Sequence, residues 1–143
     1  MQLVQSKLQF QDYKVNRLTF SSIPDFEAKD DEVFNLNPEF TRRIEALGDD
    51  KYSLTLSVSL GTNGERMPFV LEASVTGLFV VKDVEDPFKM MKLNATSILF
   101  PYVRSLLSML SNLASIPPVV LPPINFAEMV NRAEEKAAEE TKN

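Results

Sequence analysis

The chain has 143 residues, of which 44% are hydrophobic and 24% charged, a composition typical of a globular domain that can bury its own core. Its 15 basic and 20 acidic residues give a net charge of -5, which disfavours binding to the phosphate backbone of nucleic acids. Cysteine and histidine are both absent, which excludes disulfides, thiolate zinc sites and nucleophiles activated by an imidazole. We therefore expect one domain over residues 1–143, without a metal or cofactor, that is not an enzyme.

The sequence shows no recognisable targeting or membrane segment. Its start, MQLVQSKLQF, lacks the cationic segment and apolar run of a signal peptide. No window reaches the roughly 18 uninterrupted apolar residues that a membrane-spanning helix needs. We expect a cytoplasmic protein with no membrane insertion.

A first strand is predicted from about Leu8 to Phe20, but its apolar residues change phase twice along the way. Leu8 and Phe10 are in step, Tyr13 and Val15 are shifted by one position, and Leu18 and Phe20 shift back. Because a one-residue slip moves side chains to the other face of a sheet, either bulges intervene or both faces are covered, for example by a second subunit.

Residues 23–47 are predicted to form a loop that leads into a short strand. The carboxylate pairs Asp30–Asp31 and Asp49–Asp50 are the visible candidates for acid–base chemistry. Their polar surroundings favour solvated turns instead of a catalytic site.

The clearest local pattern is a β-hairpin over residues 51–81. The first strand, KYSLTLSVSL, alternates strictly between apolar and hydroxyl-bearing residues, and a second alternating run includes residues 69–76. Asn63–Gly64, between the runs, is a preferred pair for left-handed turn positions. We expect two antiparallel strands, each with one apolar face and one hydroxyl-rich face.

Beyond Asp86–Pro87 the period changes to that of a helix, predicted over residues 98–114. Two adjoining apolar rows form a wide face: Leu99, Tyr102, Leu106, Met109 and Leu113, then Val103, Leu107, Leu110 and Ala114. Pro101 marks either the first turn or a kink. A polar stripe opposite contains Arg104, Ser105, Ser108, Ser111 and Asn112, and it is either an oligomer interface or a mildly polar solvent face.

A connector without charge, SIPPVVLPPINF at residues 115–126, precedes the last predicted helix. Asn125 is a favoured N-cap, and Glu128 stands where it can complete a capping box. The prolines hold the connector extended, so that it either walls a groove or packs on the core. The charged tail at residues 134–143 is predicted to fray.

The order of these elements resembles the SecB family of protein-export chaperones. The resemblance is carried by the LFPY run with Arg104 after it, by the proline-rich connector and by the PPINF entry to the last helix, and it continues over QFQDYKVNRLTF and PFVLEASVTGLFVV. It implies an α+β fold, with a four-stranded antiparallel sheet packed with two helices, and a homotetramer built as a dimer of dimers. It also implies an ATP-independent holdase that binds unfolded polypeptides in hydrophobic grooves and delivers precursors to the SecA motor, and some relatives serve toxin–antitoxin systems.

By this resemblance, the polypeptide-binding groove lies between residues 34–40 and the connector with its last helix. Its expected lining is Phe34, Leu36, Phe40, Leu121, Ile124, Phe126 and Met129. Exposed apolar surface without catalytic groups fits a protein that holds other chains. An adaptor or scaffold that binds one dedicated partner, and a carrier of small apolar ligands, remain alternatives.

The surface expected to dock the delivery partner departs from the family pattern. Family members that bind SecA display acidic residues on the outer sheet face, whereas the matching positions here are Arg17, Ser21, Val70 and Glu72. Only Glu72 keeps a carboxylate, so SecA is a doubtful partner and another delivery partner is open.

Overall fold

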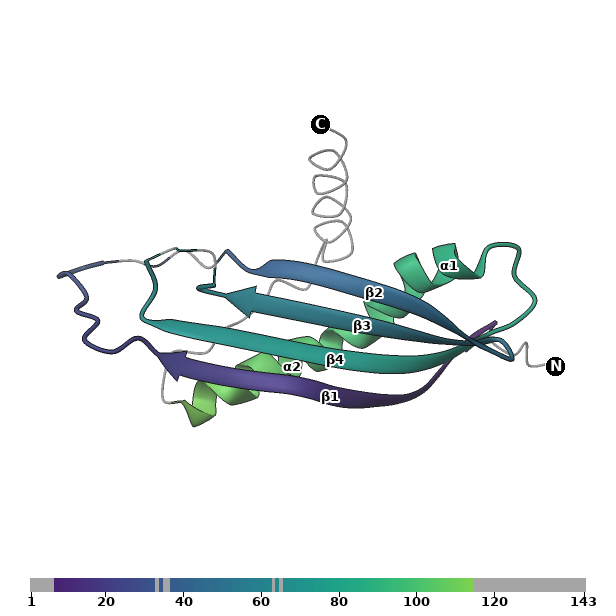
Figure 1. The fold of residues 1–143 in the computed structure, drawn as a ribbon, viewed down its shortest axis with the longest axis horizontal. Coiled ribbons are helices and arrows are strands. Elements are labelled where there is room, and N and C mark those ends of the chain that lie inside the picture. The colour runs from purple at the N-terminus through teal and green to yellow at the C-terminus, as the bar shows by residue number, and fades with distance from the viewer. Residues whose placement is uncertain (1–6, 33, 35–36, 63, 65, 115–143) are drawn as a thin grey trace, which may run out of the picture.

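In the computed structural model, which describes residues 7–32, 34, 37–62, 64 and 66–114, four antiparallel strands form one sheet in the order β1-β4-β3-β2. The strands are β1 (Leu8–Ser22), β2 (Glu39–Gly48), β3 (Lys51–Leu60) and β4 (Phe69–Val81). A short helix α1 (Pro87–Met90), a π-helical turn (Met91–Ala95) and the helix α2 (Thr96–Leu113) follow, and α2 runs along one face of the sheet (Figure 1). The predicted α+β fold with a four-stranded antiparallel sheet is confirmed. The last predicted helix lies outside the described residues.

Bulges explain the changing phase of β1. Its register with β4 shifts between Phe10 and Asp12 and again between Val15 and Arg17, which leaves an unpaired residue at each place. The six apolar residues of β1 therefore all oppose positions on the inner face of β4, namely Val81, Phe79, Gly77, Val75, Ala73 and Leu71. The bulge interpretation is confirmed, because each extra residue restores the alternation to the same face.

The second strand is longer than the sequence suggested. Strand β2 has 10 residues and pairs with β3, with Phe40 opposite Val58 on the inner face. Asp49 and Asp50 form the turn between β2 and β3 with φ values of 53° and 62°, and both side chains are exposed. This pair is a solvated turn, as predicted.

The core lies between the inner face of the sheet and α2. Its fully buried side chains come from β3, β4, the π-helical turn and α2, and they include Leu54, Leu56, Leu71, Val75, Met91, Leu99, Val103 and Leu107. A Cβ atom on Gly77 would lie 2.9 Å from Phe79 Cε2 and 3.1 Å from Leu99 Cδ1. Glycine at this position lets α2 approach the sheet closely.

The helical region begins at Pro87, eleven residues before the start of the predicted helix. Asp86 caps α1 by accepting a hydrogen bond from the Lys89 backbone N–H at 3.1 Å, and Pro87 occupies the first helical position. Pro101 consequently lies inside α2 rather than in its first turn. Arg42 on β2 donates to the Lys92 carbonyl at 2.7 Å, which ties the edge of the sheet to the π-helical turn.

Candidate functional site

The segment that links β1 to β2 (residues 23–38, the β1–β2 connector) carries the described part of the predicted groove. Phe34 is half-buried and packs against the core, and Phe40 is buried at the start of β2. Leu36 lies outside the described residues, as do the side chains expected to form the opposite wall, namely Leu121, Ile124, Phe126 and Met129. The structure therefore describes one side of the expected groove.

An aromatic pair that sequence reasoning missed extends this wall. The ring centroids of Phe26 and Phe34 lie 5.7 Å apart, and Phe26 is also half-buried. The guanidinium carbon of Arg66, from the loop between β3 and β4, lies 4.5 Å from the centre of the Phe26 ring. Phe26 lies in an irregular loop without a periodic pattern, so no sequence signal connected it with Arg66.

Arg66 also forms an ion pair in which two of its nitrogens bind one carboxylate. Its Nε and Nη2 atoms donate to the two carboxylate oxygens of Glu32 at 2.8 and 3.1 Å, and Nη2 donates to the Glu27 carbonyl at 2.7 Å. Hydrogen bonds from Arg66 and from the Lys29 backbone N–H hold the pKa of Glu32 below its usual range. Glu32 is consequently ionised at neutral pH, which preserves the pair with Arg66.

The four residues predicted to dock a delivery partner come together on the outer face of the sheet. In the pairing of β1 with β4, Ser21 lies opposite Val70. Arg17 lies opposite Ser74, and Glu72 is two residues from Ser74 on the same face of β4. Arg17 Nε is 3.3 Å from Glu72 Oε2, so the only carboxylate of this set faces a positive charge. The local charge of this surface is close to balanced rather than acidic.

The rest of the outer face is a ladder of hydroxyl groups that bind one another. Thr55 and Thr76 share a hydrogen bond of 2.7 Å, and Ser57 donates to Ser74 at 3.0 Å. Asn16, the bulged residue of β1, donates to Thr76 at 2.8 Å. These contacts join β1, β4 and β3 and leave a polar surface hollow of about 540 Å³.

One residue of the polar stripe predicted on α2 does not lie on the outer side of the helix. Ser111 has 0% exposure and donates its hydroxyl hydrogen to the Leu107 carbonyl at 2.8 Å. The assignment of Ser111 to an outer interface is wrong, because its place on the helix turns it toward the sheet and its hydroxyl bonds within the helix. Ser105 and Asn112 are exposed, and Arg104 and Ser108 are half-buried.

The first apolar row predicted for the helix is largely uncovered. Tyr102, Met109 and Leu113 are 38%, 56% and 77% exposed. Tyr102 also contacts the exposed Tyr13 of β1, with ring centroids 4.7 Å apart, and Val15 of β1 is exposed as well. Together these five residues form an apolar surface along the β1 edge of the protomer, which we call the β1/α2 flank.

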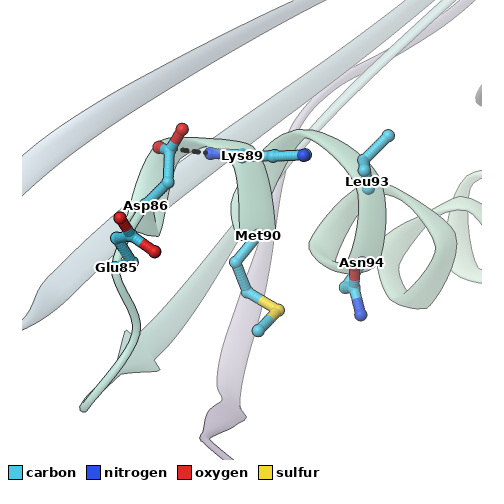
Figure 2. Close-up of a pocket in the computed structure, with 6 residues that line it drawn as sticks. All are labelled: Glu85, Asp86, Lys89, Met90, Leu93 and Asn94. Atoms are coloured by element: carbon cyan, nitrogen blue, oxygen red, sulfur yellow. Dashed lines mark hydrogen bonds between the residues drawn. The ribbon is translucent and has the colours of Figure 1, made fainter.

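A hollow of about 690 Å³ beside α1 has no arrangement that suggests catalysis (Figure 2). Its lining is Glu85, Asp86, Lys89, Met90, Leu93 and Asn94. Asp86 serves as the cap of α1, and the side chains of Glu85 and Asn94 are exposed. Among the described residues there is no cluster of acidic side chains arranged to hold a metal ion. No helix within the described ranges is long and apolar enough to cross a membrane.

Comparison with known proteins decides the family of this chain. Residues 5–137 match the family described as preprotein translocase subunit SecB. The chain belongs to the SecB family. The resemblance inferred from the LFPY run, the connector and the PPINF entry is thereby confirmed.

Relatives from several organisms share this family pattern. An uncharacterized protein of Methanocaldococcus jannaschii is 33% identical over 141 residues, which cover 94% of this chain and 89% of the relative. The protein-export protein SecB of Magnetococcus marinus is 36% identical over 109 residues, covering 73% of this chain and 67% of the relative.

A solved structure shows the same fold. The SecB-like chaperone of Mycobacterium tuberculosis, in complex with a peptide from an antitoxin, superimposes with a TM-score of 0.64. It is 16% identical, and the match covers 80% of this chain and 88% of the other. At this identity, the likeness concerns the SecB fold.

Proposed function

We propose that this SecB-family protein is an ATP-independent molecular chaperone that holds unfolded or precursor polypeptides in a hydrophobic groove. The observation that carries the proposal is family membership across residues 5–137. It is supported by the relatives named protein-export protein SecB and by the peptide complex of a SecB-like chaperone with the same fold. Holding an unfolded chain needs exposed apolar side chains and no catalytic group.

The proposed groove lies beside the aromatic wall of the β1–β2 connector. Phe34 would form one side, while Phe40 is buried in the core behind it. Leu36, Leu121, Ile124, Phe126 and Met129 complete the lining expected from the sequence. The half-buried state of Phe26 and Phe34 supports a site at this end of the sheet, because such side chains have apolar surface left to cover.

The proposal is tested by suppression of aggregation of a slowly refolding protein, measured by light scattering without nucleotide. We expect the wild-type protein to suppress aggregation and Ile124→Asp to weaken suppression, with little change in the far-ultraviolet circular dichroism or the melting temperature. A carboxylate placed in the core would instead destabilise the protein strongly, typically by several kcal/mol. Such a loss of stability would reject the groove assignment, and failure of the wild-type protein to protect the client would reject the holdase function.

We also propose that the protein assembles as a homo-oligomer, most simply a tetramer made of two dimers. Strand β1 lies at an edge of the described sheet, and its outer side is paired with no described strand. The exposed β1/α2 flank adjoins that edge. A second copy would cover both features, since edge strands and apolar patches of this kind favour association.

The delivery partner is proposed to differ from SecA. Arg17 replaces an acidic residue of the family pattern and pairs with Glu72, so attraction for a basic tail is reduced. Calorimetry at low salt with the isolated SecA tail should detect negligible binding by the wild-type protein and measurable binding by the double variant Arg17→Asp, Ser21→Glu. Tight binding by the wild-type protein would restore SecA as its partner.

A dedicated adaptor remains the second candidate. The antitoxin peptide bound by the SecB-like chaperone of Mycobacterium tuberculosis favours it, because that protein is described in complex with one particular partner. A broad set of unfolded proteins competing for one site would support the general holdase, whereas a single competing partner would support the adaptor.

A further inference from the structure

The β1–β2 connector is attached to the loop between β3 and β4 at two places. At its start, the Ile23 backbone N–H donates to the Pro68 carbonyl at 2.9 Å. Further along, Arg66 binds both the Glu32 carboxylate and the Glu27 carbonyl while its guanidinium lies over the Phe26 ring. Arg66 thus contacts three residues of the connector at once.

These contacts converge on the aromatic pair. Phe26 contacts both the Arg66 guanidinium and the Phe34 ring. The Glu32 carboxylate also accepts the Lys29 backbone N–H at 2.9 Å, and the Glu32 backbone N–H donates to the Lys29 carbonyl at 3.0 Å. Glu32 therefore closes a turn of the connector, and Arg66 joins that turn to the sheet.

We propose that Arg66 is a positioning residue that fixes the Phe26–Phe34 wall of the connector and thereby sets the affinity for unfolded polypeptide. The inference rests on the proposed groove and adds a residue outside its expected lining. Arg66 acts through Glu32, Glu27 and Phe26 rather than by contact with the client.

The chemistry of this junction requires arginine. A guanidinium is planar and carries donors that can bind both oxygens of a carboxylate while its face stacks on an aromatic ring. A lysine ammonium keeps the charge but is a point donor without that face. The side chains of Arg66 and Glu32 are 48% and 17% exposed, so the pair is placed to orient the connector and not to support the core.

The junction is expected to persist over a wide pH range. Hydrogen bonding to Arg66 is the main reason that the pKa of Glu32 is lowered, with a further contribution from the Lys29 N–H. A lowered carboxyl pKa means that the pair contributes above the ordinary pKa and is lost as the pH falls through the lowered value. At neutral pH Glu32 is therefore ionised and able to pair with Arg66.

A double-mutant cycle tests the inference on the full-length protein. The dissociation constant for a permanently unfolded, fluorescently labelled polypeptide is measured for wild type, Arg66→Gln, Glu32→Gln and the double variant. We expect each single change to raise the dissociation constant about fivefold or more. The double variant should bind no more weakly than whichever single variant binds less tightly, because both changes break the same contact. Arg43→Gln, which breaks the exposed Arg43–Glu45 ion pair on β2, is the matched control and should bind as wild type does.

Arg66→Lys separates geometry from charge. We expect it to bind nearly as weakly as Arg66→Gln, and full recovery of affinity would overturn the positioning role by showing that charge alone matters. Unchanged affinity in Arg66→Gln beside a binding wild type would overturn the inference alone. No binding by the wild type would instead remove the proposed function, and this role of Arg66 with it.

Limited proteolysis tests whether Arg66 holds the connector in place when no client is bound. Cleavage by a lysine-specific protease after Lys29, quantified by mass spectrometry, should accelerate several-fold in Arg66→Gln and Glu32→Gln. Cleavage after Lys82, at the end of β4, should not change. Equal cleavage after Lys29 in all variants would overturn the inference, because Arg66 would then not hold the connector.

Discussion

The two apolar rows of α2 have the same period in the sequence but opposite environments in the protomer. Val103 and Leu107 of one row are essentially fully buried against the sheet, whereas Tyr102, Met109 and Leu113 of the other row retain 38%, 56% and 77% exposure. Leu99, the first residue of that second row, is buried. A sheet covers only one side of a helix that lies on it, so the second row needs another surface. The comparison indicates that one row supports the fold, and the uncovered part of the other is the surface that the proposed assembly would use.

The largest expected effect comes from Ser111, which lies on the covered side of α2. Ser111→Glu should reduce the free energy of unfolding by at least about 3 kcal/mol, because an uncompensated charge would enter the core. Ser105→Glu, an exposed change on the same helix, should cost no more than about 0.5 kcal/mol. Denaturant unfolding measures both, and similar losses would contradict the assigned orientation of the helix.

A comparable or smaller loss is expected when the covered row is truncated. Leu107→Ala should cost about 2–5 kcal/mol through lost burial and the remaining cavity. Leu113→Ala, which shortens a side chain of the exposed row, should change protomer stability much less. Urea unfolding of the dissociated protomer measures the loss of unfolding free energy for each variant. Equal losses for Leu107→Ala and Leu113→Ala would show that both rows belong to the core.

The exposed row is expected to affect assembly more than folding. Met109→Asp should dissociate the oligomer at micromolar concentration while the circular dichroism stays native, because a charge would face the partner copy. Ser108→Glu is the informative second variant, since it lies in the polar stripe first predicted as the interface. Light scattering after size exclusion distinguishes the two: dissociation by Ser108→Glu alone would return the interface to the stripe, and a monomeric wild type would contradict assembly altogether.

Much of the fold was predictable because its strands follow simple rules. Strict alternation identified β3 and β4, and the phase changes in β1 correctly indicated bulges. The early helical start at Asp86–Pro87 was missed because the intervening residues include a π-helical turn, which departs from the ordinary helical period. The exposure of Tyr102, Met109 and Leu113 could not be predicted, because periodicity reveals apolar rows but not how many of them a neighbouring surface covers.

The candidate site was less accessible to sequence reasoning. Phe34 and Phe40 followed from the family resemblance, but the contacts of Phe26 and Arg66 depend on two loops that are far apart in the chain. Ser111 was assigned to the wrong side because a serine can be buried when its hydroxyl donates to the preceding helical turn. Pairing of Arg17 with Glu72 required the strand register, which the bulges shift.

Titration of the wild-type protein with one polypeptide, presented first permanently unfolded and then folded, tests the central claim most directly. Calorimetry without nucleotide should show saturable binding of the unfolded form and none of the folded form. Absence of binding to the unfolded form, or equal affinity for both forms, would contradict the account of this SecB-family protein as a holdase.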